Sequence, residues 1–206
     1  MSTTSGELPP TPQLAPWLRV HRALMPDYNR KATAYWWTMV MLGVAALVHA
    51  FLSVAALPGA AQVQVAFGVA IAMLAGVFPV RIPRSKSSFA AGEIFIFLLL
   101  LLHGPAAATL AACAETLVGA LRTSKRWTSR IASPTISAVA MFVAGSSLQA
   151  LRDALQRHGL TNEGLIVMAT MLFSLLFFML NTLLVSTVLR LKRNEPLRMS
   201  NFLYFL

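Results

Sequence analysis

The sequence predicts an all-α fold, a polytopic membrane bundle of about six transmembrane helices, and three observations support this class. Only 12% of the 206 residues are charged and 57% are hydrophobic, whereas a soluble domain carries about 25% charged residues. The apolar residues form long runs, which are typical of membrane spans and not of amphipathic helices or strands. The basic residues gather in alternate connections between these runs.

Six apolar stretches are the predicted helices. Crossing roughly 30 Å of hydrocarbon takes about 20 apolar residues, whereas the third stretch, at about 1.5 Å per residue, extends only about 21 Å. It either crosses a thinned bilayer or forms a re-entrant hairpin with the fourth stretch. In chain order the stretches are Tyr35–Leu57, Gln62–Val80, Phe89–Leu102, Pro105–Leu121, Ile131–Ala150 and Gly164–Leu189.

The basic residues predict how the helices are oriented. Fifteen of the 17 lysine and arginine residues lie before the first stretch, between the second and third, between the fourth and fifth, or after the sixth. By the positive-inside rule, these connections and both termini face the cytoplasm. Each cation there contributes on the order of 1 kcal/mol against anionic lipid headgroups. We name one set of them the basic collar: Arg81, Arg84, Lys86, Arg122, Lys125, Arg126, Arg130, Arg190, Lys192 and Arg193.

Outside the expected six-helix membrane domain, residues 35–193, the amino-acid composition of the chain differs. Residues 1–16 have the Pro, Ser, Thr and Gly bias of a disordered tail. Residues 17–34 combine an apolar helical face with arginines, which predicts an interfacial helix and a linker. Residues 194–206 become apolar again after a basic stretch. We expect them to form a juxtamembrane segment or the start of a further span, in a chain that continues beyond Leu206.

The motif content predicts no active site within these residues. No Walker loop, GxGxxG, triad spacing or paired-cysteine motif is present, so we expect no catalytic residue, no metal and no cofactor. Cys113 is the single cysteine, which leaves no disulfide within one chain. The net charge of +10 is not expected to serve nucleic acid, because such a surface interleaves basic residues with stacking aromatics.

Two glutamates inside the apolar stretches are the main candidate site residues. Gly104 and Pro105 predict the turn of a helical hairpin, with Glu93 lying 11 residues before Gly104 and Glu115 lying 11 after it. The two carboxylates then sit at similar depth, about 16 Å from the turn. Acidic residues within spans are candidates to bind a proton, a cation or a solute, and two that faced each other would share a proton.

A structural explanation competes for both glutamates. Glu93 lies near the start of its predicted helix, where the helix dipole favours a negative charge and the interface is within reach. Glu115 lies two turns before Arg122 and could extend toward it. The sequence leaves both explanations open.

Three further polar residues are candidates to contact a ligand or a proton. His49 and His103 both lie toward the predicted outer half, where they either pack or form a pH-sensing or metal site; two histidines without further ligand spacing favour packing. Asn181 lies deep in the last stretch. It either bonds a neighbouring helix or contacts a ligand.

The region around the hairpin resembles a known family. Its pattern is an F-P-x-R-x-P link, a polar patch, an apolar helix, a G-P turn, a small-residue helix and an R-x-S-x-R-W link. These are Phe78–Pro83, Ser85–Ser88, Phe89–Leu102, Gly104-Pro105, Ala106–Ala120 and Arg122–Trp127. The pattern resembles the N-terminal membrane-associated sensor regions of bacterial diguanylate cyclases and HD-GYP-type cyclic-di-GMP signalling proteins.

This resemblance implies a sensor in the bacterial inner membrane, with an unknown small ligand or stimulus and a cytoplasmic output domain beyond Leu206. No output-domain motif lies within the sequence itself. A homodimer is left open. G-P hairpins also occur in the substrate-binding components of energy-coupling-factor vitamin transporters, so the alternative is a small-solute transporter or substrate-binding component. A purely structural membrane subunit is the third hypothesis.

Overall fold

The computed structural model describes residues 28–77, 80–81, 88–89, 92–159 and 162–193, and these are almost entirely helical. The one exception is a pair of two-residue antiparallel strands, β1 (Val80–Arg81) and β2 (Ser88–Phe89), with Val80 opposite Phe89. The predicted all-α class is therefore confirmed. The helices are α2 (Arg30–Ala55), α3 (Gly59–Val77), α4 (Glu93–His103), α5 (Pro105–Thr123), α6 (Trp127–Arg157) and α7 (Glu163–Arg193).

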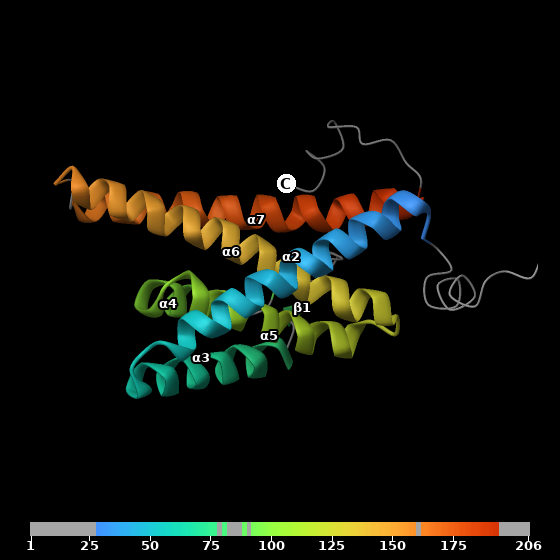
Figure 1. Cartoon of the computed structure of the whole chain (residues 1–206), viewed down its shortest axis with the longest axis horizontal. Coiled ribbons are helices and arrows are strands. Elements are labelled where there is room, and N and C mark those ends of the chain that lie inside the picture. The colour runs from blue at the N-terminus through green and yellow to red at the C-terminus, as the bar shows by residue number, and fades with distance from the viewer. Residues whose placement is uncertain (1–27, 78–79, 82–87, 90–91, 160–161, 194–206) are drawn as a thin grey trace, which may run out of the picture.

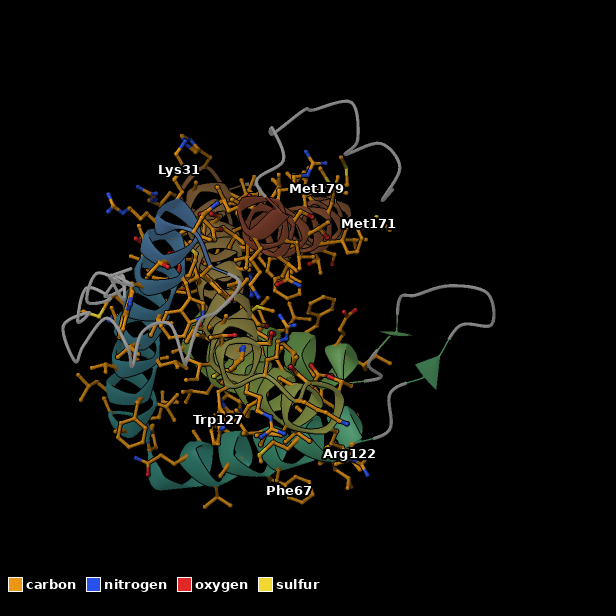
Figure 2. The ribbon with its side chains drawn as sticks, turned by 90° about the vertical axis from the view of Figure 1, so that its right-hand side faces the viewer. Lys31, Phe67, Arg122, Trp127, Met171 and Met179 are labelled. Carbon is orange, nitrogen blue, oxygen red and sulfur yellow. The ribbon has the colours of Figure 1, made fainter. Side chains whose placement is uncertain are left out.

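The helices run back and forth along one direction of an elongated bundle (Figure 1). The first turns of α2 and α6 and the last turns of α5 and α7 lie at one end. The α2–α3 turn, the α4–α5 turn, the end of α6 and the start of α7 lie toward the other. Most of the described residues of the basic collar lie at the first end. Figure 2 looks onto that end, with Lys31, Arg122 and Trp127 labelled.

Four helices are long and apolar enough to cross a membrane: α2, α3, α6 and the Gly164–Lys192 part of α7. Large apolar side chains cover their outward faces. Phe67 of α3 and Met171 of α7 point away from the bundle (Figure 2) and are both 68% exposed. Because soluble proteins rarely expose apolar patches of this extent, the surface is consistent with a membrane location.

Several predicted boundaries were wrong. The helix expected from Phe89 begins at Glu93, because Ser88 and Phe89 pair with the strand that follows α3. The expected linker before Tyr35 is partly helical: α2 begins at Arg30, with the Asn29 side chain accepting a 2.7 Å hydrogen bond from the Ala32 N–H. Residues 1–27 and 194–206 lie outside the described residues, as do Arg84 and Lys86.

The core is built from small side chains on α5 that pack against α6. Ala107, Ala108, Ala111 and Ala112 of α5 are fully or almost fully buried. Ala140, Met141 and Ala144 of α6 are buried in the same cluster, which Ile96, Leu99 and Leu100 of α4 complete. Because lipid tails are as apolar as leucine, helices in a membrane associate through close packing, and small residues let their backbones approach.

A second close approach joins α2 to α6 at Gly43. A Cβ atom added to Gly43 would lie 2.5 Å from the Thr135 Cβ and 2.8 Å from the Thr135 Cα. The same crossing is held nearer the helix ends by Trp36, whose indole N–H donates a 3.0 Å hydrogen bond to the Thr128 carbonyl. Only glycine fits at position 43 without moving the helices apart.

We predict that Gly43→Ala lowers the stability of the protein by about 1–3 kcal/mol, because the neighbouring atoms are partly backbone and cannot rotate away. The measurement is the thermal midpoint of the purified protein in detergent, read by fluorescence-detected size exclusion. The matched control is Gly119→Ala in α5, where a Cβ meets nothing within 4 Å; it should keep or raise the midpoint. Equal midpoints for the two variants would contradict the close approach.

Candidate functional site

A cavity of about 320 Å³ lies among α3, α4, α5, α6 and α7 and collects three of the five candidate ligand residues, Glu93, Glu115 and Asn181. We name it the carboxylate cavity. Its lining combines small residues, hydroxyl groups, apolar side chains and one cation. The other lining residues are Gly76, Ile96, Phe97, Thr116, Gly119, Ala120, Arg122, Thr123, Ser133, Ser137 and Phe177.

The hairpin geometry explains why the two carboxylates meet. Gly104 turns the chain with a φ of 84°, which favours glycine, and Pro105 opens α5 with its fixed φ. Glu93 and Glu115 then lie at matching distances from the turn, on antiparallel helices. The two carboxylates thus line one shared cavity.

Glu115 is the most deeply placed charged group in the described part of the chain. Its side chain is 6% exposed, and its Oε1 atom has no hydrogen-bond partner among the described residues. Gly92 and Gly76 pack directly on it: a Cβ at Gly92 would collide with Oε1, and a Cβ at Gly76 would lie 2.9 Å from the Glu115 carbonyl oxygen. Two glycines therefore make the space in which this carboxylate sits.

The competing structural explanations fare differently for the two glutamates. Glu93 is the first residue of α4, at a helix N-terminus with no side-chain cap, so the dipole explanation applies to it together with the cavity. Arg122 does not pair with Glu115 in the described structure. Instead its guanidinium donates a hydrogen bond to the Val77 carbonyl at the end of α3.

Hydroxyl and amide groups of α5, α6 and α7 line the same cavity as the carboxylates. The Ser137 hydroxyl donates a 3.4 Å hydrogen bond to the Ala112 carbonyl, and the Thr116 hydroxyl donates to that same carbonyl. Their protons are therefore directed at the backbone, which leaves the oxygen lone pairs able to accept. Ser133 and the Asn181 amide complete this polar side of the lining.

Aromatic rings of α4 and α7 form part of the apolar lining of the carboxylate cavity. Phe97 of α4 meets Phe177 of α7 edge to face with ring centroids 6.3 Å apart, and it meets Phe173 at 5.4 Å. Phe97 and Phe177 line the cavity next to Ile96. The cavity thus offers carboxylates, neutral acceptors and aromatic rings to one occupant.

The two histidines lie together in a separate cavity of about 300 Å³ beside the hairpin turn. His49 of α2 packs edge to face on Phe142 with a centroid distance of 5.4 Å, and His103 is the last residue of α4. Ser53, Ser146 and Gln149 share this lining with Gly104 and Pro105. No group of three potential metal-ligating His, Cys, Asp or Glu residues occurs in the described residues. The structure therefore separates the histidines from the glutamates.

The sequence analysis missed the residues that shape the carboxylate cavity. Ser133 and Ser137 are four residues apart and lie on one face of α6, and this spacing could have marked a polar stripe. Gly92 directly precedes Glu93. No pattern in the sequence identified Phe97 and Phe177 among the many phenylalanines, because their role depends on how α4 meets α7.

We predict that Glu115→Gln raises the stability of the protein by about 1–3 kcal/mol, because a neutral amide is less costly to bury than a carboxylate with an unsatisfied oxygen and no longer repels Glu93. The measurement is the thermal midpoint at neutral pH without added ligand. Asp153→Asn makes the same chemical change at an exposed position of α6 outside the cavity and should leave the midpoint unchanged. A lower midpoint for Glu115→Gln would show that the carboxylate is structural.

Comparison with known proteins identifies no relative. No protein-family model, no curated protein and no solved structure matches the chain. The resemblance to membrane sensor regions therefore rests on the motif residues between Phe78 and Trp127, and conclusions about function have to come from the cavities.

Proposed function

We propose that the protein is a membrane sensory module in which the carboxylate cavity binds a small ligand and controls a cytoplasmic output. The observation that carries the proposal is the buried Glu115 carboxylate, whose Oε1 atom has no hydrogen-bond partner among the described residues, within a cavity of ligand size. An ionisable residue inside a membrane domain is costly to bury and is a functional candidate for that reason.

The proposed setting is the bacterial inner membrane, with six crossings and both termini in the cytoplasm. The distribution of basic residues supports this orientation, since most of the basic collar lies at one end of the bundle (Figure 1). That end would contact anionic headgroups. In this arrangement α4, with 11 residues, is the short third crossing. If α4 and α5 instead form a re-entrant hairpin, four crossings remain and the orientation is the same.

We propose that α7 transmits the effect of ligand binding to the output domain. Phe177 and Asn181 of α7 line the cavity. One turn further, the Leu184 carbonyl accepts a 3.2 Å hydrogen bond from the Tyr35 hydroxyl of α2, and at the helix end the Leu191 carbonyl accepts a 2.7 Å bond from Asn29. A ligand that binds two arrangements of α7 with different affinity would shift the output by that difference.

The resemblance of the hairpin region supports the nature of the output, a cyclic-di-GMP domain of the diguanylate cyclase type in the complete protein. The second candidate function is solute transport or substrate capture, as in energy-coupling-factor components. Its support is the position of the cavity, which helices line from several sides within the bundle. Both functions use the same cavity and differ in what happens after binding.

We predict that Ser124→Cys, in a background where Cys113 is replaced by Ala, is protected from a membrane-impermeant maleimide in intact spheroplasts. His158→Cys should react under the same conditions, because the two residues flank opposite ends of α6. Permeabilised cells, in which both should react, serve as the control. Reaction of Ser124→Cys and protection of His158→Cys would reverse the proposed orientation.

We predict that Glu115→Gln changes the cyclic-di-GMP level of cells expressing the complete native protein by about fivefold or more, the lower range of allosteric coupling. The level is measured by mass spectrometry at matched protein abundance, with Asp153→Asn as the control. An unchanged level would contradict the proposed output. Loss of solute uptake by the same variant would then favour the transport function.

A further inference from the structure

We infer that the carboxylate cavity is specific for a small organic monocation, an amine with a compact apolar body. The inference rests on the proposed ligand-binding function and adds the chemical class of the ligand. Three properties of the lining lead to it: its charge balance, its size and the pairing of carboxylates with aromatic rings.

The charge balance calls for one positive charge. Glu93 and Glu115 are the two acidic groups of the lining, and Arg122 is its one basic group. Arg122 is exposed and directs a hydrogen bond to Val77, and the Glu115 Oε1 atom has no hydrogen-bond partner among the described residues. A monocation that donates to Oε1 would satisfy this buried acceptor and balance the excess negative charge.

The size of the cavity selects an organic ligand over a bare inorganic ion. About 320 Å³ lies at the lower end of the range of about 300–1,000 Å³ for small-molecule sites. A sodium or potassium ion would leave most of that volume to be filled by water beside Ile96, Phe97 and Phe177, where apolar surface offers water few partners. An organic body fills the same space with dispersion contacts.

The lining also combines two kinds of groups that match an amine with an apolar body. The carboxylate of Glu115, the hydroxyl oxygens of Ser133 and Ser137 and the Asn181 amide oxygen can accept the N–H groups of an ammonium. Phe97 and Phe177 line the same cavity with rings that can stabilise a neighbouring cation and pack on an apolar or aromatic body. An anionic ligand would face two carboxylates, and a neutral one would leave their charge unbalanced.

The test measures binding of phenethylamine, an aromatic primary amine, to the complete native protein in lipid nanodiscs by equilibrium dialysis with radiolabel. Its neutral isostere, phenethyl alcohol, is measured alongside. We expect saturable binding of the amine and none of the alcohol at the same concentration. Glu115→Gln should weaken amine binding by about 10- to 100-fold, the usual effect of losing a buried charge-assisted hydrogen bond. Glu93→Gln should weaken it by a smaller factor, because Glu93 is only half-buried.

Asp153→Asn is the matched control and should bind like the wild type, because Asp153 lies outside this cavity. Partitioning of the amine into lipid is the same for every variant, so the difference between variants reports the site. The inference is overturned if the wild type binds no amine, or if Glu115→Gln and Glu93→Gln both bind it as tightly as the wild type.

The outcomes also separate this inference from the proposed function. If the alcohol binds and the amine does not, the cation preference fails while a ligand-binding sensor remains. If the amine binds in a Glu115-dependent way but Glu115→Gln leaves the cyclic-di-GMP level unchanged, the ligand class is supported and the sensory function fails. A protein that binds neither compound refutes the ligand class directly.

Discussion

The packing of the small-residue face of α5 is the constraint on which the rest of the structure depends. α5 lies against α2, α3, α4 and α6, and its buried alanines let these neighbours approach closely. In a membrane the hydrophobic effect does not hold helices together, so the dispersion contacts of such a face must do so. Larger side chains on α5 would separate these neighbours and change the shape of both cavities, which α5 lines.

The site around Glu115 differs from this tightly packed apolar core. A buried carboxylate with an unsatisfied oxygen lowers stability, and two glycines, Gly76 and Gly92, make room for it. Proteins keep such unfavourable groups where function requires them, at the expense of stability. The unfavourable burial of Glu115 and its proposed role in binding are therefore two aspects of the same placement.

The shortness of α4 decides where the two cavities lie. Because α4 has 11 residues, its N-terminus reaches only to the level of Glu115 on α5, and the carboxylate cavity forms beyond that end. Its C-terminus lies at the hairpin turn, where His103 joins the second cavity. A single short helix thus places the carboxylates and the histidines at its opposite ends, about 15 Å apart along its axis. α5 and α6 also line both cavities, so three helices connect them.

The amino-acid sequence was enough to predict the helical class, the hairpin turn at Gly104 and Pro105, and the equal distance of Glu93 and Glu115 from that turn. These follow from composition, glycine and proline geometry and a constant helical rise, which are local properties. The starts of α2 and α4 were mispredicted because hydropathy measures apolar length, whereas Asn29 and the strand pair set the helix ends through hydrogen bonds.

Which polar side chains line the same cavity depends on the tertiary structure. Whether Glu115 meets Arg122 or Glu93, whether Asn181 faces the same cavity, and whether His49 reaches His103 all depend on the rotation and crossing of helices that are distant in sequence. Those rotations are set by close contacts such as Gly43 against Thr135 and Gly92 against Glu115. They arise from the fit of surfaces between helices, and apolar runs in a sequence do not specify that fit.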